Sequence, residues 1–214
     1  MAMTGQVKGR RQAQSAATRA EVLAAASRLF LAHGYAATTI SAVADEAGVA
    51  VQTIYNSVGG KVRLLEGVVG LAAAGDADRH GVVERELAAG AEVTDPEVFL
   101  VRAAASVAAR VARVGPVLLV VRAAASSGDA GAAALAARTS AQRMAGMRVM
   151  IAELRARGGL RPGLTDEAAA AIAWSLSAPE TYLHLVGAQG WSQTRYRRWL
   201  ADAWATALGV SDSG

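Results

Sequence analysis

The segment ISAVADEAGVAVQTIY, residues 40–55, constrains the fold of this chain more than any other stretch. Its first part carries apolar residues at helical spacing and stops at Gly48, because glycine tolerates the positive φ that ends a helix. Val49 follows as an apolar residue that we expect to pack between the two helices, and a second short helix is predicted from Val51 to Asn56. The segment therefore predicts two short helices that pack across a tight turn.

Composition extends the helical prediction to the whole chain. Alanine fills 52 of the 214 positions, proline occurs four times, and aromatic residues make up 5% of the chain. Alanine is the best helix former, whereas the β-branched and aromatic residues that strands favour are scarce. We therefore expect an all-α fold. The chain has no cysteine, which excludes disulfides and cysteine metal sites and fits a reducing cytoplasm.

Caps and breaks divide the N-terminal third into three helices. Thr18 and Glu21 form a capping box that predicts the start of the first helix, and Gly34 ends it. Thr38 or Thr39 caps the second helix, and the third is the short helix described above. The sequence thus predicts a compact three-helix unit.

We assign residues 1–17 to a flexible basic arm, residues 18–66 to the three-helix domain and residues 67–214 to a larger helical domain. Further helices are predicted from Lys61 to Gly75, over Val82–Ala89, from Thr94 and Glu97 to a break at Gly115 and Pro116, around Val117–Val121, up to Gly158 and Gly159, from Thr165 through a kink at Pro179, and from Ser192 to Gly209.

Positive charge is concentrated near the N-terminus. Of the net charge of +4, residues 1–66 carry +3, from seven basic and four acidic side chains. Residues 67–214 are nearly balanced, with fifteen basic and fourteen acidic side chains. This asymmetry is typical of a polyanion-binding domain on a neutral body. The alternative is an ordinary solvated surface with a disordered basic tail.

No motif nominates a catalytic site, a metal site or a membrane span. His33, His80 and His184 do not lie at ligand spacing, and SVGGK at 57–61 lacks two of the residues that define a phosphate-binding loop. The longest strongly apolar run, Val117–Val121, is far shorter than the roughly 20 residues that span a bilayer. We expect a cytoplasmic protein that is not an enzyme and needs no metal ion, cofactor or membrane.

Two short helices across a tight turn are the framework of a helix-turn-helix, in which the second helix enters the DNA major groove. Its early exposed residues here would be Val51, Gln52 and Thr53. Gln52 suits a bidentate pair with adenine, Thr53 a bond to a base or phosphate, and Val51 a contact with a thymine methyl group. The alternative is that these helices pack as two short helices do in any helical protein.

Several short sequence features lie between Arg19 and Leu65: Leu29-Phe30, Gly34-Tyr35, Thr38 and Thr39, Val43-Ala44, Ala47-Gly48-Val49, Thr53-Ile54-Tyr55, and Lys61 followed by Leu64-Leu65. Together they resemble the DNA-binding domain of the tetracycline-repressor (TetR) family of bacterial transcription regulators. The rest of the chain matches that family only as an all-helical body of suitable length, with a similar GWSQTRYRRWL ending.

The resemblance implies which residues contact DNA. The recognition helix would read bases, Tyr55 and Lys61 would contact phosphates, and a threonine at the start of the second helix would touch the DNA backbone. A lysine at a helix start also suits anion binding. The alternative for Tyr55 is a mainly structural role in the core. The expected DNA-binding residues are Thr38, Thr39, Val51, Gln52, Thr53, Tyr55, Asn56 and Lys61.

Three positions depart from the family pattern. Ala50 replaces the serine that usually caps the recognition helix, Val58 replaces a usual phenylalanine, and Ser57 stands where a contact-making residue such as histidine is common. The missing cap costs about 1 kcal/mol, which is compatible with folding. The basic arm, with Lys8, Arg10 and Arg11, would compensate by reaching the minor groove; the alternative is a solvated leader.

In the resembling family the body binds a ligand and dimerises. We expect a homodimer to cover an apolar face of the last helix that carries Tyr196, Trp199, Leu200 and Ala203, with Trp204 beside it; the alternative is that this face folds back on its own chain. We expect Phe99, Arg122, Met144, Met147 and Trp174 to line a ligand pocket; the alternative is that the methionines are simply core residues.

These observations predict a ligand-responsive DNA-binding transcriptional regulator, a repressor that binds a palindromic operator as a homodimer and leaves it when a small-molecule effector binds. The alternative is a helical ligand-binding protein without DNA binding, and a small enzyme is a more distant one.

Overall fold

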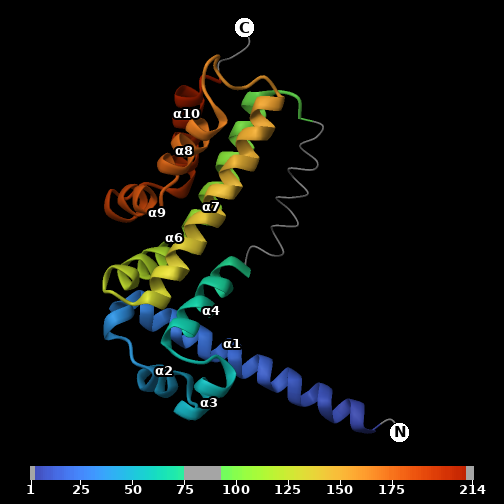
Figure 1. Cartoon of the computed structure of the whole chain (residues 1–214), viewed down its shortest axis with the longest axis vertical. Helices are drawn as coiled ribbons and strands as arrows, with labels where there is room; N and C mark the ends of the chain where they lie inside the picture. Colours follow the sequence, from blue (N-terminus) through green and yellow to red (C-terminus); the bar gives the residue numbers. More distant parts are fainter. Residues whose placement is uncertain (1–2, 75–92, 211–214) are drawn as a thin grey trace. The chain divides into compact units, whose positions relative to one another are not determined.

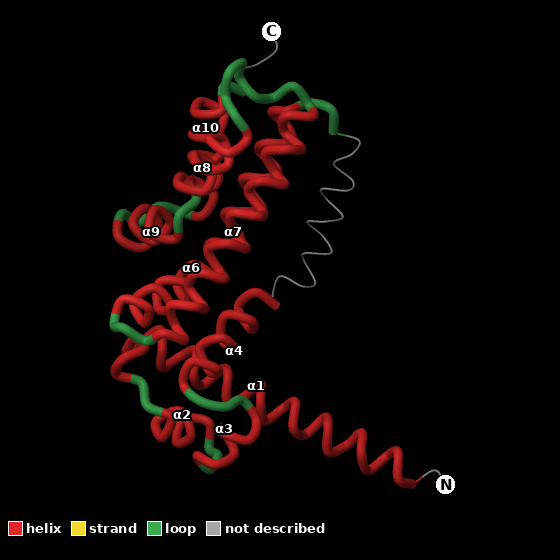
Figure 2. The backbone as a smooth tube through the Cα atoms, in the orientation of Figure 1, coloured by secondary structure: helices red, strands yellow, loops and turns green. Residues whose placement is uncertain are grey.

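The structure is a computed structural model that describes residues 3–74 and 93–210, and all regular elements in these ranges are helices (Figures 1 and 2). The helices are α1 (Met3–Ala37), α2 (Ile40–Ala47), α3 (Val51–Ser57), α4 (Lys61–Ala74), α6 (Pro96–Ser126), α7 (Ala130–Ala156), α8 (Asp166–Leu176), α9 (Pro179–Tyr182) and α10 (Gln193–Leu208), with a π-helical stretch at Leu183–Ala188. The chain forms two compact units.

The first unit joins the chain up to Ala72 with Val120–Leu135, the segment that contains the α6–α7 turn. Within it, α1, α2 and α3 pack against one another (Figure 1). Val22, Val43 and Ile54 are 0% exposed at their centre. The expected all-α fold and the three-helix unit are therefore present.

The short helices begin and end as the sequence predicts. The hydroxyl oxygen of Thr39 accepts a 3.0 Å hydrogen bond from the Ala42 backbone N–H, so Thr39 is the cap of α2. Gly48 ends α2 in the left-handed region, at φ 65°. Ala50 begins α3 without a side-chain cap, as expected from the missing serine.

Two local predictions in the N-terminal part are wrong. Thr18 is not a helix cap, because α1 extends upstream to Met3, and the residues expected to form a flexible arm are helical from there. A capping box is a local signal, and the alanines at positions 13, 16 and 17 favour helix while no proline interrupts the segment. Gly34 does interrupt the helix as predicted, because its φ of 78° and ψ of 170° are not helical, and the helical turn up to Ala37 lies beyond this kink.

The predicted break at Gly115 and Pro116 is also wrong, because α6 continues through both residues. Proline removes one helical hydrogen bond, but Val114 and Val117 on either side are buried, so packing keeps the helix intact. The cap of α6 is Asp95 and not Thr94, since its carboxylate accepts the Glu97 and Val98 N–H groups at 2.8 and 3.2 Å.

The other predicted boundaries lie in the second unit or outside the described residues. Thr165 and Ser192 cap α8 and α10 as predicted, and Gly209 ends α10. Pro179 occupies the first turn of α9 and does not kink a longer helix. The helix expected over Val82–Ala89 lies outside the described residues.

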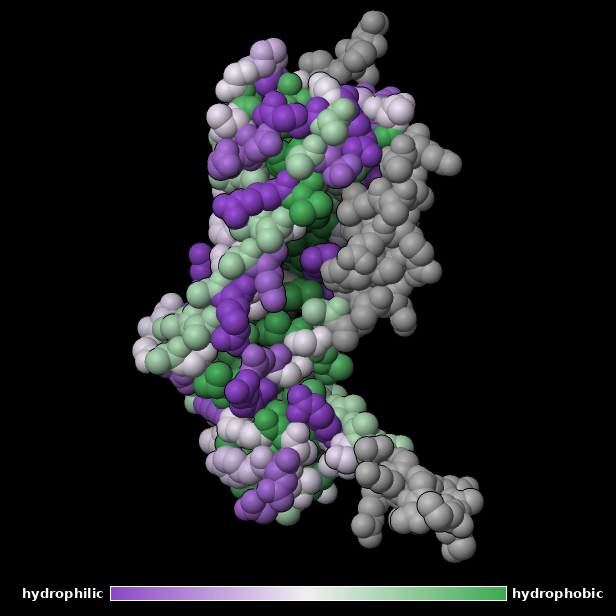
Figure 3. Space-filling model, turned by 45° about the vertical axis from the view of Figure 1, so that its right-hand side comes forward, coloured by the Kyte–Doolittle hydropathy of each residue, from purple (hydrophilic) through white to green (hydrophobic). Residues whose placement is uncertain are grey.

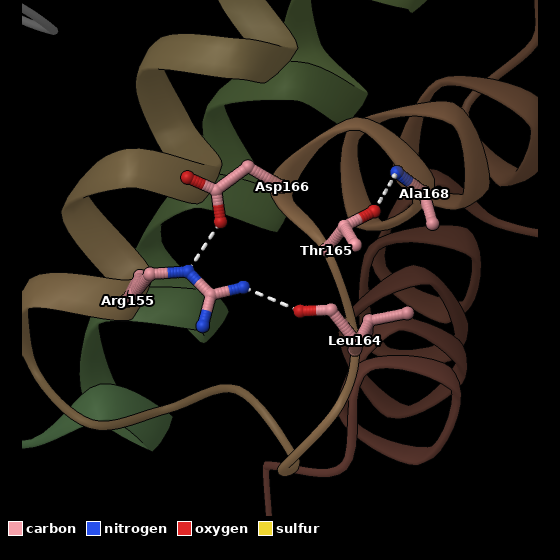
Figure 4. Close-up of polar contacts among 5 residues, drawn as sticks. All are labelled: Arg155, Leu164, Thr165, Asp166 and Ala168. Atoms are coloured by element: carbon pink, nitrogen blue, oxygen red, sulfur yellow. Dashed lines mark hydrogen bonds and ion pairs between the residues drawn. The ribbon is translucent and has the colours of Figure 1, made fainter.

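The second unit has a core formed by α6, α7, α8 and α10. Arg155, near the end of α7, donates to the Asp166 carboxylate and to the Leu164 carbonyl, while Thr165 accepts the Ala168 N–H at 3.2 Å (Figure 4). These contacts join the end of α7 to the start of α8. By length and composition alone α6 is apolar enough to cross a membrane, but its Phe99 and neighbours pack in this core.

Candidate nucleic-acid interface

Helix α3 is anchored by one side chain and exposes its neighbours. Ile54 is 0% exposed, whereas Val51 is 40% and Tyr55 50% exposed, and Gln52 and Asn56 also face solvent. Val51 and Tyr55 therefore have side-chain surface available for contact with a partner. The exposed face of α3 therefore carries four of the residues that were expected to contact DNA: Val51, Gln52, Tyr55 and Asn56.

A hydrogen bond within α3 orders two of these side chains. The Gln52 amide nitrogen donates to the Asn56 side-chain oxygen at 3.0 Å. Thr53 is partly buried, and its carbonyl accepts a 2.7 Å hydrogen bond from the Ser57 hydroxyl. Ser57 is therefore engaged with its own helix.

The two candidate threonines before α2 lie in different environments. Thr38 is 3% exposed, and its hydroxyl donates to the Gly34 carbonyl at 2.8 Å. Thr39 is exposed, and its oxygen accepts the cap hydrogen bond, so its hydroxyl hydrogen is directed elsewhere. Thr39 is thus the threonine whose side chain reaches solvent.

Lys61, the first residue of α4, lies in a cluster with Tyr35 and Asp129, which we call the tyrosine–lysine–aspartate cluster. Its Nζ atom is 4.4 Å from the centre of the Tyr35 ring and donates to the Ala36 carbonyl at 3.2 Å. The Tyr35 hydroxyl donates to Asp129 Oδ2 at 2.8 Å. The cluster brings three segments of the first unit together at the start of α4.

The environment of the cluster shifts the pKa of each member. The Ala132 backbone N–H, followed by the Tyr35 hydroxyl and the charge of Lys61, lowers the pKa of Asp129. Burial lowers the pKa of Lys61, while the charge of Asp129 opposes that shift. Burial and the bond to Asp129 raise the pKa of Tyr35. The cluster therefore favours a carboxylate at 129 and a neutral phenol at 35.

Sequence reasoning missed the neighbours of α3 on α1. A polar groove of about 310 Å³ is lined by Gln14, Ser15 and Thr18 of α1 together with Thr53, Asn56 and Ser57. Arg19, one residue further along α1, donates to the Ser57 carbonyl at 2.7 Å. The upstream extension of α1, which the sequence signals did not reveal, creates this groove.

The surface over α2 and α3 is mainly polar in the view of Figure 3. Among the described residues, no group of three or more histidine, aspartate or glutamate side chains is arranged to hold a metal ion. The chemistry available on this surface is therefore hydrogen bonding from amides and hydroxyls, apolar contact from Val51, and the charge of Lys61.

The expected pocket residues fall in different places. Phe99 and Met147 are buried in the core of the second unit, and Met144 and Trp174 pack partly buried against that core. Arg122 is exposed and belongs to the first unit, so the structure does not group it with the other four.

Two of the four residues expected at a dimer interface are already covered by their own chain. Tyr196 and Leu200 are 0% exposed within the single chain, as is Trp204, because α10 packs its apolar face on the core of its own unit. Trp199 and Ala203 are partly exposed. Only these two of the four expected interface residues present surface to a partner.

One segment of the chain matches the model of a known protein family. Residues 22–68 match the family model of the bacterial regulatory proteins of the tetR family. This segment contains α2, α3 and the start of α4, together with most of the exposed face described above. No curated protein sequence matches the chain.

Solved structures share the fold of nearly the whole chain at low identity. A structure assigned to the TetR family of transcriptional regulators, from Mesorhizobium loti, is 20% identical with a TM-score of 0.67, over 92% of this chain and 97% of that one. NalD, the secondary repressor of the MexAB-OprM multidrug efflux pump in Pseudomonas aeruginosa, is 19% identical with a TM-score of 0.61, over 94% and 100%. SmeT, solved with triclosan, is 20% identical with a TM-score of 0.64, over 92% and 93%.

Proposed function

We propose that this chain is a repressor of the TetR family of bacterial regulatory proteins, which binds a palindromic DNA operator as a homodimer and leaves it when a small molecule binds. Its N-terminal domain is the helix-turn-helix of a DNA-binding transcriptional regulator. We further propose which residues read DNA, that the protein acts as a dimer, that it binds a ligand, and that it represses transcription.

The observation that carries the proposal is the exposed face of α3. Ile54 fixes the helix in the core, and Val51, Gln52 and Tyr55 face outward on a helix that begins directly after the α2–α3 turn. Gln52 is ordered by its bond to Asn56, which limits the rotamers it must lose on pairing with a base. A glutamine amide pairs bidentately with adenine, and the Val51 side chain meets a thymine methyl group.

Phosphate contacts would fix the register of α3 on the duplex. Thr39 offers a hydroxyl donor at the start of α2, Tyr55 a half-exposed phenol, and Lys61 an ammonium at the first residue of α4. A helix start adds the partial positive charge of its free N–H groups, so a phosphate is favoured at Lys61. Such contacts position the protein without reading sequence.

The second unit would supply the dimer interface and the ligand site. We assign Trp199 and Ala203 of α10 to the interface and the core around Phe99, Met144, Met147 and Trp174 to the ligand. Trp174 Nε1 is buried without a hydrogen-bond partner among the described residues, and a ligand acceptor would satisfy this donor. NalD is a repressor and SmeT was solved with triclosan, which supports a ligand-responsive repressor.

Selection from a random-sequence DNA library with the full-length protein tests the proposal. We expect a palindromic duplex whose binding weakens as salt rises, because Lys61 and its neighbours displace counterions. Gln52→Ala should weaken binding and relax preference at one base pair in each half-site, while Gln142→Ala, at an exposed glutamine of α7, should not. If no preferred duplex emerges, the proposal fails, and the result favours the alternative function, a ligand-binding protein that does not bind DNA.

A further inference from the structure

The α6–α7 turn delivers a carboxylate to the end of α1. Asp129 lies between Ser126, the last residue of α6, and Ala130, the first of α7. Its Oδ2 accepts the hydrogen bond from Tyr35, a residue 94 positions earlier that is 7% exposed and stacks on Phe30 at 5.7 Å between ring centres. A buried tyrosine hydroxyl thus depends on a residue from a distant part of the sequence.

The orientation of this carboxylate is fixed by helix α7. Asp129 Oδ1 accepts the Ala132 backbone N–H at 3.0 Å, so the same side chain caps α7 and holds Tyr35. The first turn of α7 also lies against α4, since a Cβ on Gly131 would be 3.0 Å from the Val62 side chain. The turn is therefore seated directly beside Lys61, the neighbour of Val62.

Lys61 depends on the segment that Asp129 holds. Its ammonium stands over the Tyr35 ring at 4.4 Å and donates to the carbonyl of the next residue, Ala36. The charge of Asp129 favours the charged form of Lys61. Moving the Tyr35 side chain would remove the ring under the ammonium, and removing the carboxylate would leave the Tyr35 hydroxyl without its acceptor.

We infer that Asp129 is a positioning residue for DNA binding: through Tyr35 it places the Lys61 ammonium for contact with a phosphate. This inference rests on the proposed function. A free lysine side chain has many rotamers, and a contact with phosphate must restrict them. A lysine held over a fixed aromatic ring and a fixed carbonyl loses fewer of them. Asp129 therefore strengthens binding although its own charge repels DNA.

Whether Asp129→Asn weakens or tightens DNA binding distinguishes a positioning role of Asp129 from simple repulsion by its charge. If Asp129 acted only as a negative charge near DNA, Asp129→Asn would tighten binding. Positioning predicts the reverse, about fivefold weaker binding, because a charge-assisted contact of Lys61 is impaired. The slope of log affinity against log salt should also become shallower by about 0.9, the value for one lost phosphate contact.

The variants are chosen to keep the fold. Asparagine caps helices as well as aspartate does, so Asp129→Asn preserves the start of α7. Tyr35→Phe keeps the ring under Lys61 and removes only the hydroxyl that binds Asp129. Asp45→Asn, at an exposed position of α2 outside the cluster, is the matched loss of charge.

The experiment measures binding of the full-length variants to the selected duplex at several salt concentrations, with thermal unfolding as the check on folding. We expect Asp129→Asn and Tyr35→Phe to weaken binding and Asp45→Asn to leave it unchanged or tighter. In a Lys61→Ala background, Asp129→Asn should cause no further weakening. The inference is overturned if Asp129→Asn tightens binding. It is also overturned if Asp129→Asn weakens binding as much in the Lys61→Ala background as in the unmodified protein. Absence of any selected duplex for the unmodified protein overturns the proposed function instead.

Discussion

The Arg19 guanidinium donates a 2.7 Å hydrogen bond to the carbonyl oxygen of Ser57, the last residue of α3. The final carbonyls of a helix have no partner within the helix, and an arginine at that end satisfies one of them and complements the helix dipole. Because Arg19 belongs to α1, the bond ties the candidate reading helix to the longest helix of the same unit. Seven residues make α3 too short to be stable alone.

Arg19→Ala is expected to loosen the C-terminal end of α3. The pair is exposed, so the free energy of unfolding should fall by no more than about 1 kcal/mol. Amide hydrogen exchange around residues 55–59 should nevertheless accelerate, and DNA affinity should fall. Arg28→Ala is the control: it removes the same charge from α1, but Arg28 pairs with Glu46 of α2 at 2.8 Å. Equal acceleration in both variants would contradict the role given to Arg19.

Ala50→Ser is expected to stabilise the protein. Ala50 has the extended backbone of an N-cap, at φ −69° and ψ 145°, and contributes no side-chain hydrogen bond. A serine oxygen there would accept the Gln52 N–H or share the Thr53 N–H, which donates to the Ala50 carbonyl at 2.8 Å. The free energy of unfolding should rise by about 1 kcal/mol in urea titrations. Ala50→Gly, which supplies no oxygen acceptor, should not reproduce the gain.

Local signals predicted the short helices because each of those boundaries depends on neighbouring residues. Thr39 caps α2 and Gly48 ends it through bonds that span five residues or fewer. Family resemblance added Tyr55 and Lys61 as candidate contacts. The same kind of signal failed at Pro116, where the burial of residues on both sides preserves the helix.

Contacts between distant parts of the chain could not be predicted in this way. Nothing near Tyr35 indicates that its hydroxyl will meet Asp129, and nothing near Asp129 indicates more than a helix cap. The expected interface on α10 failed for a related reason. The pattern correctly gave an apolar face, but the residues that cover Tyr196 belong to other helices of the same chain. Periodicity identifies a face to be buried and leaves open what buries it.

Tyr196→Phe is expected to stabilise the protein at neutral pH. The Tyr196 side chain is 0% exposed, and its hydroxyl has no hydrogen-bond partner among the described residues. An unsatisfied buried hydroxyl is costly, so its removal should raise the free energy of unfolding by about 1 kcal/mol. Tyr182→Phe is the matched control. The Tyr182 hydroxyl bonds to Gln193, so this variant should lose stability. Destabilisation of both variants alike would contradict the assignment.

The same phenol predicts a loss of stability at alkaline pH. Burial is the main cause that raises the pKa of Tyr196 to about 12, with the Tyr182 phenol acting in the same direction and the Arg143 charge opposing it. An unfolded tyrosine has a pKa of about 10, so between these values the folded chain retains a proton that the unfolded chain releases. Ionisation of Tyr196 therefore costs no stability below about pH 10, and the cost grows as pH rises toward 12. Urea titrations between about pH 9 and pH 11 should therefore show a shallower decline for Tyr196→Phe than for the unmodified protein, because one of the phenols that drive the decline is gone. Parallel declines in the two proteins would show that Tyr196 ionises as readily in the folded chain as in the unfolded one.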